Sequence, residues 1–291
     1  MEPTGTAATE RTGTAVRVVT VAFNPGPELE TFARTLGDAT TAPVRLVVVD
    51  NGTDAAVVND VAARYGADVV RPGANLGYGA AANLGARPGT EPWVVVANPD
   101  IAWRPGALDA LLAAGERHPR AGALGPRILN PDGTVYPSAR PLPSLVQGAG
   151  HALLGRVWPA NPWTRAYHAG QADGHERAVG WLSGACLLLR REAAAAVAGF
   201  DEGYFMFFED VDLGDRLGRA GWENVYVPAA VVVHDQGVSW RDRPAPMIRA
   251  HHRSAERYLH RRYRAGYQAP LRYALSAGLR LRCWWQTRAA R

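Results

Sequence analysis

The chain has 291 residues, of which 47% are hydrophobic and 20% charged. This is typical of a soluble globular protein with one large α/β domain, or one such domain and an appendage. No apolar run approaches the roughly 18 residues that a membrane-spanning helix needs. Two cysteines, Cys186 and Cys283, exclude a disulfide framework. Cys186 lies in an apolar run that predicts burial, and a reducing, cytoplasmic location fits this cysteine usage.

The net charge of +5 conceals an uneven distribution along the chain. Residues 241–291 contain 13 arginines but only two acids, Asp242 and Glu256, so this segment has a balance of +11. The rest of the chain has 19 arginines and 25 acids, a balance of −6. A basic end on a mildly acidic body indicates a surface that meets anions, which could be phosphates, nucleic acid or an acidic membrane.

Strand and helix patterns alternate through the first 118 residues. Residues 1–15 are rich in Thr, Ala and Gly and lack the apolar core of a signal peptide, so we expect a disordered tail. After it, strands are expected at 16–23, 44–50, 67–72 and 92–100, and helices within 25–36, 54–65, 77–86 and 105–118. The strands are continuously apolar, which predicts a parallel sheet covered by helices on both faces.

Polar residues end two of these strands. The stretch VVVANPDIAW, residues 94–103, passes from a buried strand directly to Asn98, Pro99 and Asp100, and Asp50 ends an earlier strand in the same way. Parallel sheets bind ligands at the carboxyl ends of their strands. Each carboxylate also has a purely structural alternative, because Asp50 can form an Asx-turn and Asp100 can cap the next helix.

The second half of the chain is less regular. Residues 126–177 are rich in proline, glycine and aromatic residues, and we expect long loops over the site. Residues 178–191 predict a buried strand, and residues 224–237 predict two short strands around Pro228 that end on His234. A histidine at a strand end is often structural, so His234 alone does not establish a site.

An acidic cluster opens the last helix expected before the basic end. Residues 205–220 have helical spacing and carry Glu209, Asp210, Asp212 and Asp215. Carboxylates favour the first turn of any helix, so this cluster can also be an ordinary helix start.

Several motifs together resemble family 2 glycosyltransferases with the GT-A fold. In family order across residues 17–240 they are VVTVAFNPG, VVVDNGT, NLGYGAAANLGAR, NPDI, WLSGACLLLRR, GFDEGYFMFFEDVDLGDRLGRAGW and VVHDQGVSW. The resemblance implies a Rossmann-like, mostly parallel sheet flanked by helices. Within the family, NPD and GFDEGYFMFFEDVDL are most similar to bacterial rhamnosyltransferases, including those that act on polyprenyl-diphosphate-linked GlcNAc.

The resemblance implies a divalent cation on the donor diphosphate. Family members use an Asp-x-Asp element after this strand, and here it reads Asn98-Pro99-Asp100. Asp100 is therefore the expected metal ligand together with His234, and Asn98 is expected to hydrogen-bond the donor. Mn²⁺ or Mg²⁺ suits such a site because phosphate oxygens complete the shell, and an imidazole favours Mn²⁺. The missing first carboxylate puts tight metal binding without nucleotide in doubt.

Other roles follow from the same resemblance, position by position. Asp50 matches the residue that accepts the N3–H of uracil or thymine, and Asp210 matches the catalytic base of inverting members. The further donor-binding positions are Asn75, Gly77 and Asn83, and the acceptor-binding positions are Trp181, Ser183, Gly184 and Glu209. Trp181 has the alternative of plain core packing.

The function implied is inverting, metal-dependent transfer of L-rhamnose from dTDP-rhamnose to a polyprenyl-diphosphate-linked GlcNAc in cell-wall linker assembly. Alternatives are another hexosyltransferase of surface-polysaccharide assembly, or a catalytically inactive nucleotide-sugar-binding scaffold subunit. A nucleic-acid-binding function would rest only on the basic end, which has no helix-turn-helix or zinc-finger signature, so no nucleic-acid partner is expected.

The expected organisation is a tail at 1–15, a GT-A domain at 16–240 and a basic helical extension at 241–291. Within 270–288, leucines and tryptophans alternate with arginines, which suits the interface of an anionic membrane. We therefore expect a cytoplasmic protein, peripheral on the inner face of the cell membrane. The alternative is a helix packed on the catalytic domain.

Overall fold

The structure, a computed structural model, describes residues 15–143, 174–235 and 244–289. Of the expected tail only Ala15 is described, and it directly precedes the first strand. The middle of the expected loop region, residues 144–173, also lies outside the described ranges, as do residues 236–243.

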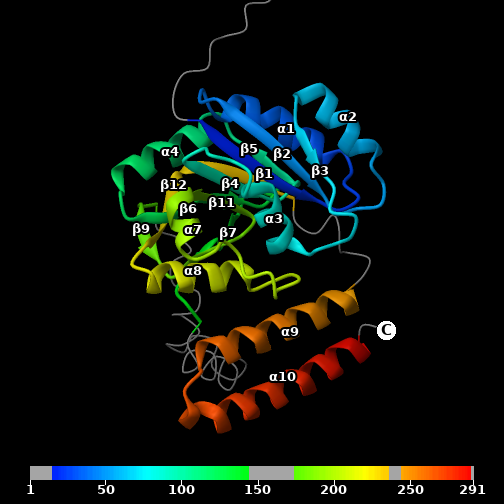
Figure 1. Cartoon of the computed structure of the whole chain (residues 1–291), viewed down its shortest axis with the longest axis vertical. Helices are drawn as coiled ribbons and strands as arrows, with labels where there is room; N and C mark the ends of the chain where they lie inside the picture. Colours follow the sequence, from blue (N-terminus) through cyan, green and yellow to red (C-terminus); the bar gives the residue numbers. More distant parts are fainter. Residues whose placement is uncertain (1–14, 144–173, 236–243, 290–291) are drawn as a thin grey trace, which may run out of the picture.

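Ten strands of the described chain form one mixed sheet in the order β3-β2-β1-β4-β11-β6-β12-β5, with β7 beside β6 and β9 beside β12 (Figure 1). The first four run parallel to one another: β1 (Val16–Ala22), β2 (Val44–Asp50), β3 (Asp68–Val70) and β4 (Trp93–Ala97). The remaining six are β5 (Ile101–Trp103), β6 (Ala121–Leu129), β7 (Val135–Tyr136), β9 (Arg177–Val179), β11 (Cys186–Arg190) and β12 (Glu223–His234). A separate two-stranded sheet pairs β8 (Ala139–Arg140) with β10 (Trp181–Leu182).

Helices cover both faces of the large sheet, as the apolar strands predict. One face packs against α1 (Glu28–Ala39), α2 (Ala56–Tyr65) and α4 (Ala107–Arg117). The other packs against α3 (Tyr78–Ala86), α7 (Arg191–Ala196) and α8 (Glu209–Arg219). Within β1, Val18 faces the first core and Val19 the second, and both are fully buried.

The sheet is not parallel throughout. β11 runs antiparallel to both of its neighbours, β4 and β6, and β5 runs antiparallel to β12. Continuous apolarity reports burial on two faces and carries no information about strand direction. β6 and β12 are parallel to each other, so β12 has the same direction as β1, β2 and β4.

Four expected elements differ from those observed. The chain stays regular beyond Pro126, since β6 extends to Leu129 and is followed by β7 and β8. Residues 178–191 form parts of three strands, because Gly180 and the segment 183–185 interrupt the expected one. The two strands expected around Pro228 are one strand, β12, with a register shift between Val227 and Val231.

The fourth difference is the start of α8, which begins at Glu209, four residues later than expected. Phe207 and Phe208 directly precede it with φ values of 68° and 67°. A large aromatic residue in this left-handed region is a genuine outlier, and neither phenylalanine can be part of the right-handed helix, which therefore begins after them.

Two long helices form the basic end. α9 (Pro244–Arg262) and α10 (Ala269–Ala289) lie side by side below the sheet, joined by the short turn η1 (Gly266–Gln268), and α9 lies between α8 and α10 (Figure 1). None of the helices in the described part of the chain has the length and hydrophobicity needed to span a bilayer.

Candidate active site

The expected site residues at strand ends gather at one edge of the sheet. Asp50 is the last residue of β2, Asn98 and Asp100 lie between β4 and β5, and His234 ends β12. Because β2, β4 and β12 have the same direction, their carboxyl ends lie at the same edge.

Asp100 and His234 form a close pair. The Oδ1 atom of Asp100 lies 3.0 Å from Nε2 of His234, and both side chains are almost buried. β5 explains the proximity: Ile101 pairs with His234, and Ile101 and Trp103 are buried in the core, so the residue before them is held against the end of β12. The Nδ2 atom of Asn98 lies 3.2 Å from the same His234 Nε2.

This pair fits a divalent cation. Two ligands at right angles around a cation, each at about 2.1 Å, are about 3.0 Å apart, which is the separation seen here. Asp100 Oδ1 is buried and, beyond this ion-pair contact with His234, forms no hydrogen bond in the described part of the chain. No cluster of three or more potential ligands occurs among the described residues, so a donor diphosphate would have to supply further ligands.

Two adjacent carboxyl groups open α8. Glu209 is 7% exposed and packs near Gly79 of α3, and its Oε2 atom has no hydrogen-bond partner in the described structure. Asp210 is partly exposed, and its two oxygens accept hydrogen bonds of 2.8 Å from the backbone N–H groups of Gly184 and Val211.

The surroundings act differently on the two carboxyl groups. Burial, and secondly the charge of Asp210, raise the pKa of Glu209 to about 8. Burial also raises the pKa of Asp210, but the hydrogen bonds from the Gly184 and Val211 N–H groups and the charge of Arg140 oppose that rise. These N–H groups favour a carboxylate at Asp210, whereas Glu209 Oε2 has no partner in the described structure, so Asp210 is the better candidate for a base.

The segment 183–185 joins the two halves of the site. Gly184 donates its N–H to Asp210, and the carbonyl oxygen of Ala185 accepts the N–H of Asn98 at 2.9 Å. The carbonyl of Gly184 accepts a 2.6 Å hydrogen bond from the hydroxyl of Tyr78, the first residue of α3. Ser183 is buried and faces inward, with its Oγ accepting from the Ala185 N–H at 3.3 Å. One short segment thus connects Asp210, the expected base, with the expected cation ligands and α3.

At the other end of the site, Asp50 makes the expected Asx-turn contact and a second contact, with Arg71, that was not predicted. Its Oδ1 accepts the N–H of Gly52 at 3.1 Å, which is the Asx-turn alternative. Its Oδ2 lies 3.4 Å from Nε of Arg71, whose side chain is 45% exposed. A partly exposed arginine beside a buried carboxylate can move aside or stack when a nucleobase approaches, so a role in base recognition stays a prediction for Asp50.

The remaining donor positions contact the protein itself. Asn75 accepts the N–H of Gly77 at 2.9 Å. Gly77 has φ +81°, and a Cβ there would lie 2.1 Å from the carbonyl oxygen of Phe205, so the glycine permits α3 to approach the turn before α8. Asn83 is buried, and its amide is hydrogen-bonded at both ends to the backbone of Phe200. In this structure, Gly77 and Asn83 position the segment that leads to the base.

Trp181 makes the packing contacts of the structural alternative and leaves part of its side chain exposed. Its indole N–H donates to the carbonyl oxygen of Pro141 at 3.1 Å, and a Cβ on Gly214 of α8 would lie 2.8 Å from its own Cβ, which is the packing alternative. The guanidinium of Arg140 lies 5.5 Å from its ring centroid. The side chain is only half-buried, so contact with a sugar stays open.

Three residues that border the site were not predicted as site residues: Tyr78, Arg71 and Arg140. Arg140 lies near Trp181 and Tyr136, and its positive charge opposes the rise in the pKa of Asp210. It belongs to the region expected to be irregular, and only the pairing of β8 with β10 brings it to the site. Tyr78 stood in a quoted motif, but its contact with Gly184 spans 106 residues.

α9 supports the turn that precedes the two carboxyl groups. The ring of His251 lies 5.6 Å from that of Phe207 and 5.3 Å from that of Phe208. Ser254 donates a hydrogen bond to the carbonyl oxygen of Met206. Asp201, in the loop before this turn, pairs with Arg257 and Arg261. The left-handed pair of phenylalanines is thus held from the side of α9.

The comparison with protein families decides the assignment: the family model described as "Glycosyltransferase like family 2" matches residues 14–264. The chain belongs to glycosyltransferase family 2. The match includes the whole sheet and α9. It establishes a glycosyltransferase, and the GT-A fold expected from the motifs is confirmed by solved structures of the same architecture.

Similar proteins agree with this family 2 assignment. The chain is 50% identical over 277 residues to N-acetylglucosaminyl-diphospho-decaprenol L-rhamnosyltransferase of Mycobacterium tuberculosis, covering 91% of this chain and 90% of that protein. Among solved structures, a mannosyltransferase of Pyrobaculum calidifontis in complex with GDP-Man and Mn²⁺ matches with a TM-score of 0.58 and 18% identity, covering 94% of this chain and 73% of that one. GalNAc-T7 with UDP, GalNAc and Mn²⁺ has the same TM-score at 14% identity, covering 78% and 44%.

Proposed function

We propose that this family 2 glycosyltransferase transfers L-rhamnose from dTDP-rhamnose to N-acetylglucosaminyl-diphospho-polyprenol. The supporting observation is the 50% identity, over nine-tenths of both chains, to an enzyme whose name specifies this acceptor type and this sugar. The site geometry adds independent support, because a partly exposed carboxylate, Asp210, lies beside a buried, protonated one, Glu209.

In this proposal Asp210 is the general base. The acceptor hydroxyl forms a bond to the anomeric carbon, the bond from that carbon to the diphosphate oxygen breaks, and the hydroxyl proton passes to Asp210. A single displacement of this kind inverts the anomeric configuration and needs no covalent enzyme intermediate. The N–H groups of Gly184 and Val211 fix the carboxylate, and Arg140 favours its ionised form.

Asp100 and His234 would hold a divalent cation, Mn²⁺ or Mg²⁺. When bound, the cation would supply a positive charge that stabilises the leaving diphosphate. Asn98 lies next to both ligands and would contact the donor, while Asp50 would accept the N3–H of thymine. The geometry of the Asp100–His234 pair and the Mn²⁺ in the names of two structures with this fold support this part of the proposal.

The acceptor carries a long lipid, and α10 offers a surface for the membrane that holds it. Leu271, Leu281 and Trp285 are 46%, 67% and 66% exposed, and at 100° per residue they fall within about 80° of arc on one face of the helix. Exposed arginines flank this stripe, among them Arg282 and Arg288. The opposite face packs on α9, so α10 is both packed on the protein and open on its outer side. An anionic bilayer would attract each arginine by about 1 kcal/mol.

The decisive experiment is a donor panel. The purified chain is incubated with UDP-, GDP- and dTDP-sugars and a short-chain N-acetylglucosaminyl-diphospho-lipid, and donor consumption and product mass are measured. Consumption of dTDP-rhamnose alone, with a product heavier by one deoxyhexose, is the expected result. Transfer from a different nucleotide sugar would instead identify another hexosyltransferase, and consumption of none would support the scaffold alternative.

A further inference from the structure

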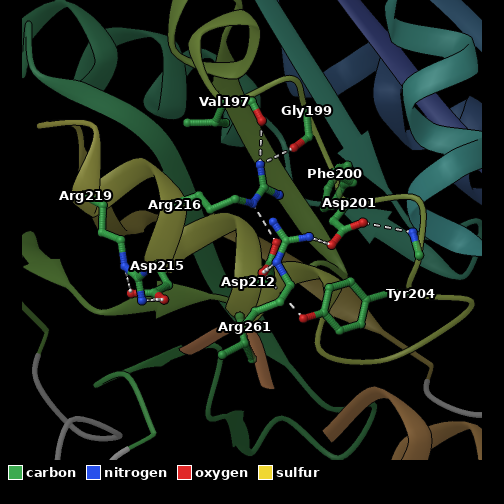
Figure 2. A network of polar contacts seen from close by, with 12 residues as sticks. Val197, Gly199, Phe200, Asp201, Tyr204, Asp212, Asp215, Arg216, Arg219 and Arg261 are labelled. Carbon is green, nitrogen blue, oxygen red and sulfur yellow. Dashed lines mark hydrogen bonds and ion pairs between the residues drawn. The ribbon is translucent and has the colours of Figure 1, made fainter. Parts of the chain in front are cut away.

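A second polar cavity lies behind the catalytic helix, between α8 and α9. Its volume is about 210 Å³, and five arginines, two aspartates and Tyr258 line it. Asp212, Asp215 and Arg219, which all line it, lie about 140–200° around α8 from Asp210 at 100° per residue. The cavity is therefore on the face opposite the base, and the proposed acceptor and donor positions do not reach it. Figure 2 shows most of these side chains.

Positive charge is in excess around this cavity. Asp212 is paired with Arg216 at 2.6 Å, and Asp215 is paired with Arg219 at 2.7 Å and with Arg262 at 3.3 Å. These pairs use both aspartates of the lining, which leaves an excess of positive charge from the other arginines.

Two further arginines of the lining complete this imbalance. Arg261 is shared between Asp201 in the neighbouring loop and Asp212, while Arg264 is exposed and has no acidic partner among the described residues. Burial and the nearby charge of Arg264 lower the pKa of the Arg261 guanidinium. The smaller of these two effects, the charge of Arg264, agrees with the excess of arginines around the cavity.

Two buried polar groups of the lining are unsatisfied. Tyr258 is only 3% exposed, and its hydroxyl has no hydrogen-bond partner within the described ranges. The Nη2 group of Arg216 is likewise buried and unpartnered there. Burial, and then the charge of Asp215, raise the pKa of Tyr258, so its hydroxyl keeps its proton and can donate. Buried donors without acceptors are rare in native proteins and point to a missing acceptor.

We propose that this cavity binds a phosphate group, with the Tyr258 hydroxyl and the surrounding guanidinium groups as donors. Arginine forks match the oxygens of phosphate, and a charge-assisted hydrogen bond to an anion is stronger than one to a neutral acceptor. A water molecule occupies about 30 Å³, so the cavity has room for a phosphate and some of its waters. A wider groove of about 660 Å³ shares Arg261 and Arg264 with the cavity and provides an open approach.

The phosphate can come from solution or from a lipid headgroup, and one experiment distinguishes the two. Binding of inorganic phosphate to the full chain is measured by titration calorimetry in a zwitterionic buffer with chelator, so that no divalent cation can hold phosphate at the catalytic site. In a second arm, sedimentation with phosphatidylcholine vesicles is compared with and without phosphatidic acid. Three variants are measured alongside: Tyr258→Phe and Arg264→Gln in the cavity, and Arg34→Gln, an exposed arginine on α1, as the matched control.

We expect Tyr258→Phe and Arg264→Gln each to weaken binding about tenfold, the order expected for one lost charge-assisted hydrogen bond, while Arg34→Gln has no effect. If the two cavity variants bind inorganic phosphate more weakly in the calorimetric arm, the ligand is free phosphate. If they are weakened only in sedimentation with phosphatidic acid vesicles, the ligand is a lipid headgroup. Both substitutions remove groups without a protein partner, so the thermal unfolding of the variants should match that of the parent chain. Equal binding by Tyr258→Phe and the parent chain in both arms, or binding in neither, overturns the proposal.

Discussion

The hydroxyl of Ser254 donates a 2.7 Å hydrogen bond to the carbonyl oxygen of Met206, across 48 residues of sequence. Met206 precedes the two phenylalanines with positive φ, and these precede Glu209 and Asp210. The basic end of the chain is therefore in contact with the turn that precedes Asp210, the proposed base. Strained backbone persists only where its surroundings hold it, and Ser254 and His251 are part of those surroundings.

Substitution of Ser254 by alanine should lower kcat several-fold while KM for the donor changes little. The hydrogen bond is worth about 1 kcal/mol in stability, and its loss frees the turn before Asp210. Ser276→Ala is the matched control, because Ser276 is equally buried but bonds only to His260 within the α9–α10 pair. Steady-state kinetics and urea unfolding measure both effects. An equal fall in kcat for the two variants would show that the turn is not specifically supported.

Asp210→Asn should reduce turnover by about 10²–10⁴, the usual range for a lost general base, with donor affinity nearly unchanged. Asp212→Asn is the comparison, since Asp212 is buried, bonded to Arg216, and directed away from Asp210. It should lower stability and leave kcat of the folded protein close to that of the parent. Turnover and nucleotide-sugar binding are measured separately. A critical Asp212 with a dispensable Asp210 would refute the base assignment.

Glu209→Gln should change how stability depends on pH. The pKa of Glu209 is about 8 in the folded protein and near 4.5 when the chain is unfolded. The folded state holds the proton more tightly than the unfolded state. The contribution of Glu209 to the free energy of unfolding is therefore fully present below pH 4.5 and is lost as pH rises through about 8. The glutamine variant, which mimics the protonated acid, should therefore equal the parent near pH 4.5 and exceed it at pH 8. Parallel stability curves across this window, measured by urea unfolding, would show that Glu209 is not protonated when folded.

Asp100→Ala and His234→Ala should each nearly abolish transfer, and excess chelator should have the same effect on the parent chain. Binding of Mn²⁺ gives an independent readout: its free-ion electron paramagnetic resonance signal should fall when protein and nucleotide are both present, and fall much less with either variant. Without nucleotide we expect only a weak fall in the free Mn²⁺ signal, because no cluster of three or more potential ligands occurs among the described residues. Full activity in excess chelator would eliminate the cation from the mechanism.

Deletion of residues 268–291 should weaken sedimentation with anionic vesicles and slow transfer to long-chain lipid, while transfer to a short-chain acceptor persists. The deletion removes the exposed stripe of α10 but leaves α9 against the catalytic turn. A Trp284→Ser, Trp285→Ser double variant is the milder test, because both indoles are more than half exposed. Vesicle binding as strong as that of the parent chain would assign the anchor to another part of the protein.

Local patterns predicted the first half of the fold closely. β2 has the expected bounds, and Asp50 ends it, because its valine-rich run is buried from Leu46 onward, as in a central strand. For β11 the apolar run correctly predicted a buried strand, but nothing in it indicated that the strand runs antiparallel to β4. Strand direction depends on how distant segments connect, and no local pattern records it.

In the candidate site, too, local patterns predicted some features, while others depend on contacts between distant segments. Asp100 and His234 were expected together, and they lie 3.0 Å apart. The start of α8 was misplaced because Phe207 and Phe208 adopt a conformation that phenylalanine rarely takes without support from elsewhere in the chain. Arg140 and Arg71 could not be predicted, since both reach the site only through pairings formed in the folded chain.

The hydrogen bonds of the segment 183–185 have a consequence for how this enzyme can diverge. Its Gly184 N–H donates to Asp210, the proposed base, and its Ala185 carbonyl accepts the N–H of Asn98 in the turn that also carries Asp100. Both contacts use main-chain atoms of the segment, which any residue except proline at position 184 would provide. Backbone contacts therefore fix the positions of Asp210 and of the Asn98–Asp100 turn, between which a hydroxyl would approach and a diphosphate would depart. Side chains around them can be exchanged to suit another sugar or another lipid while those positions are preserved.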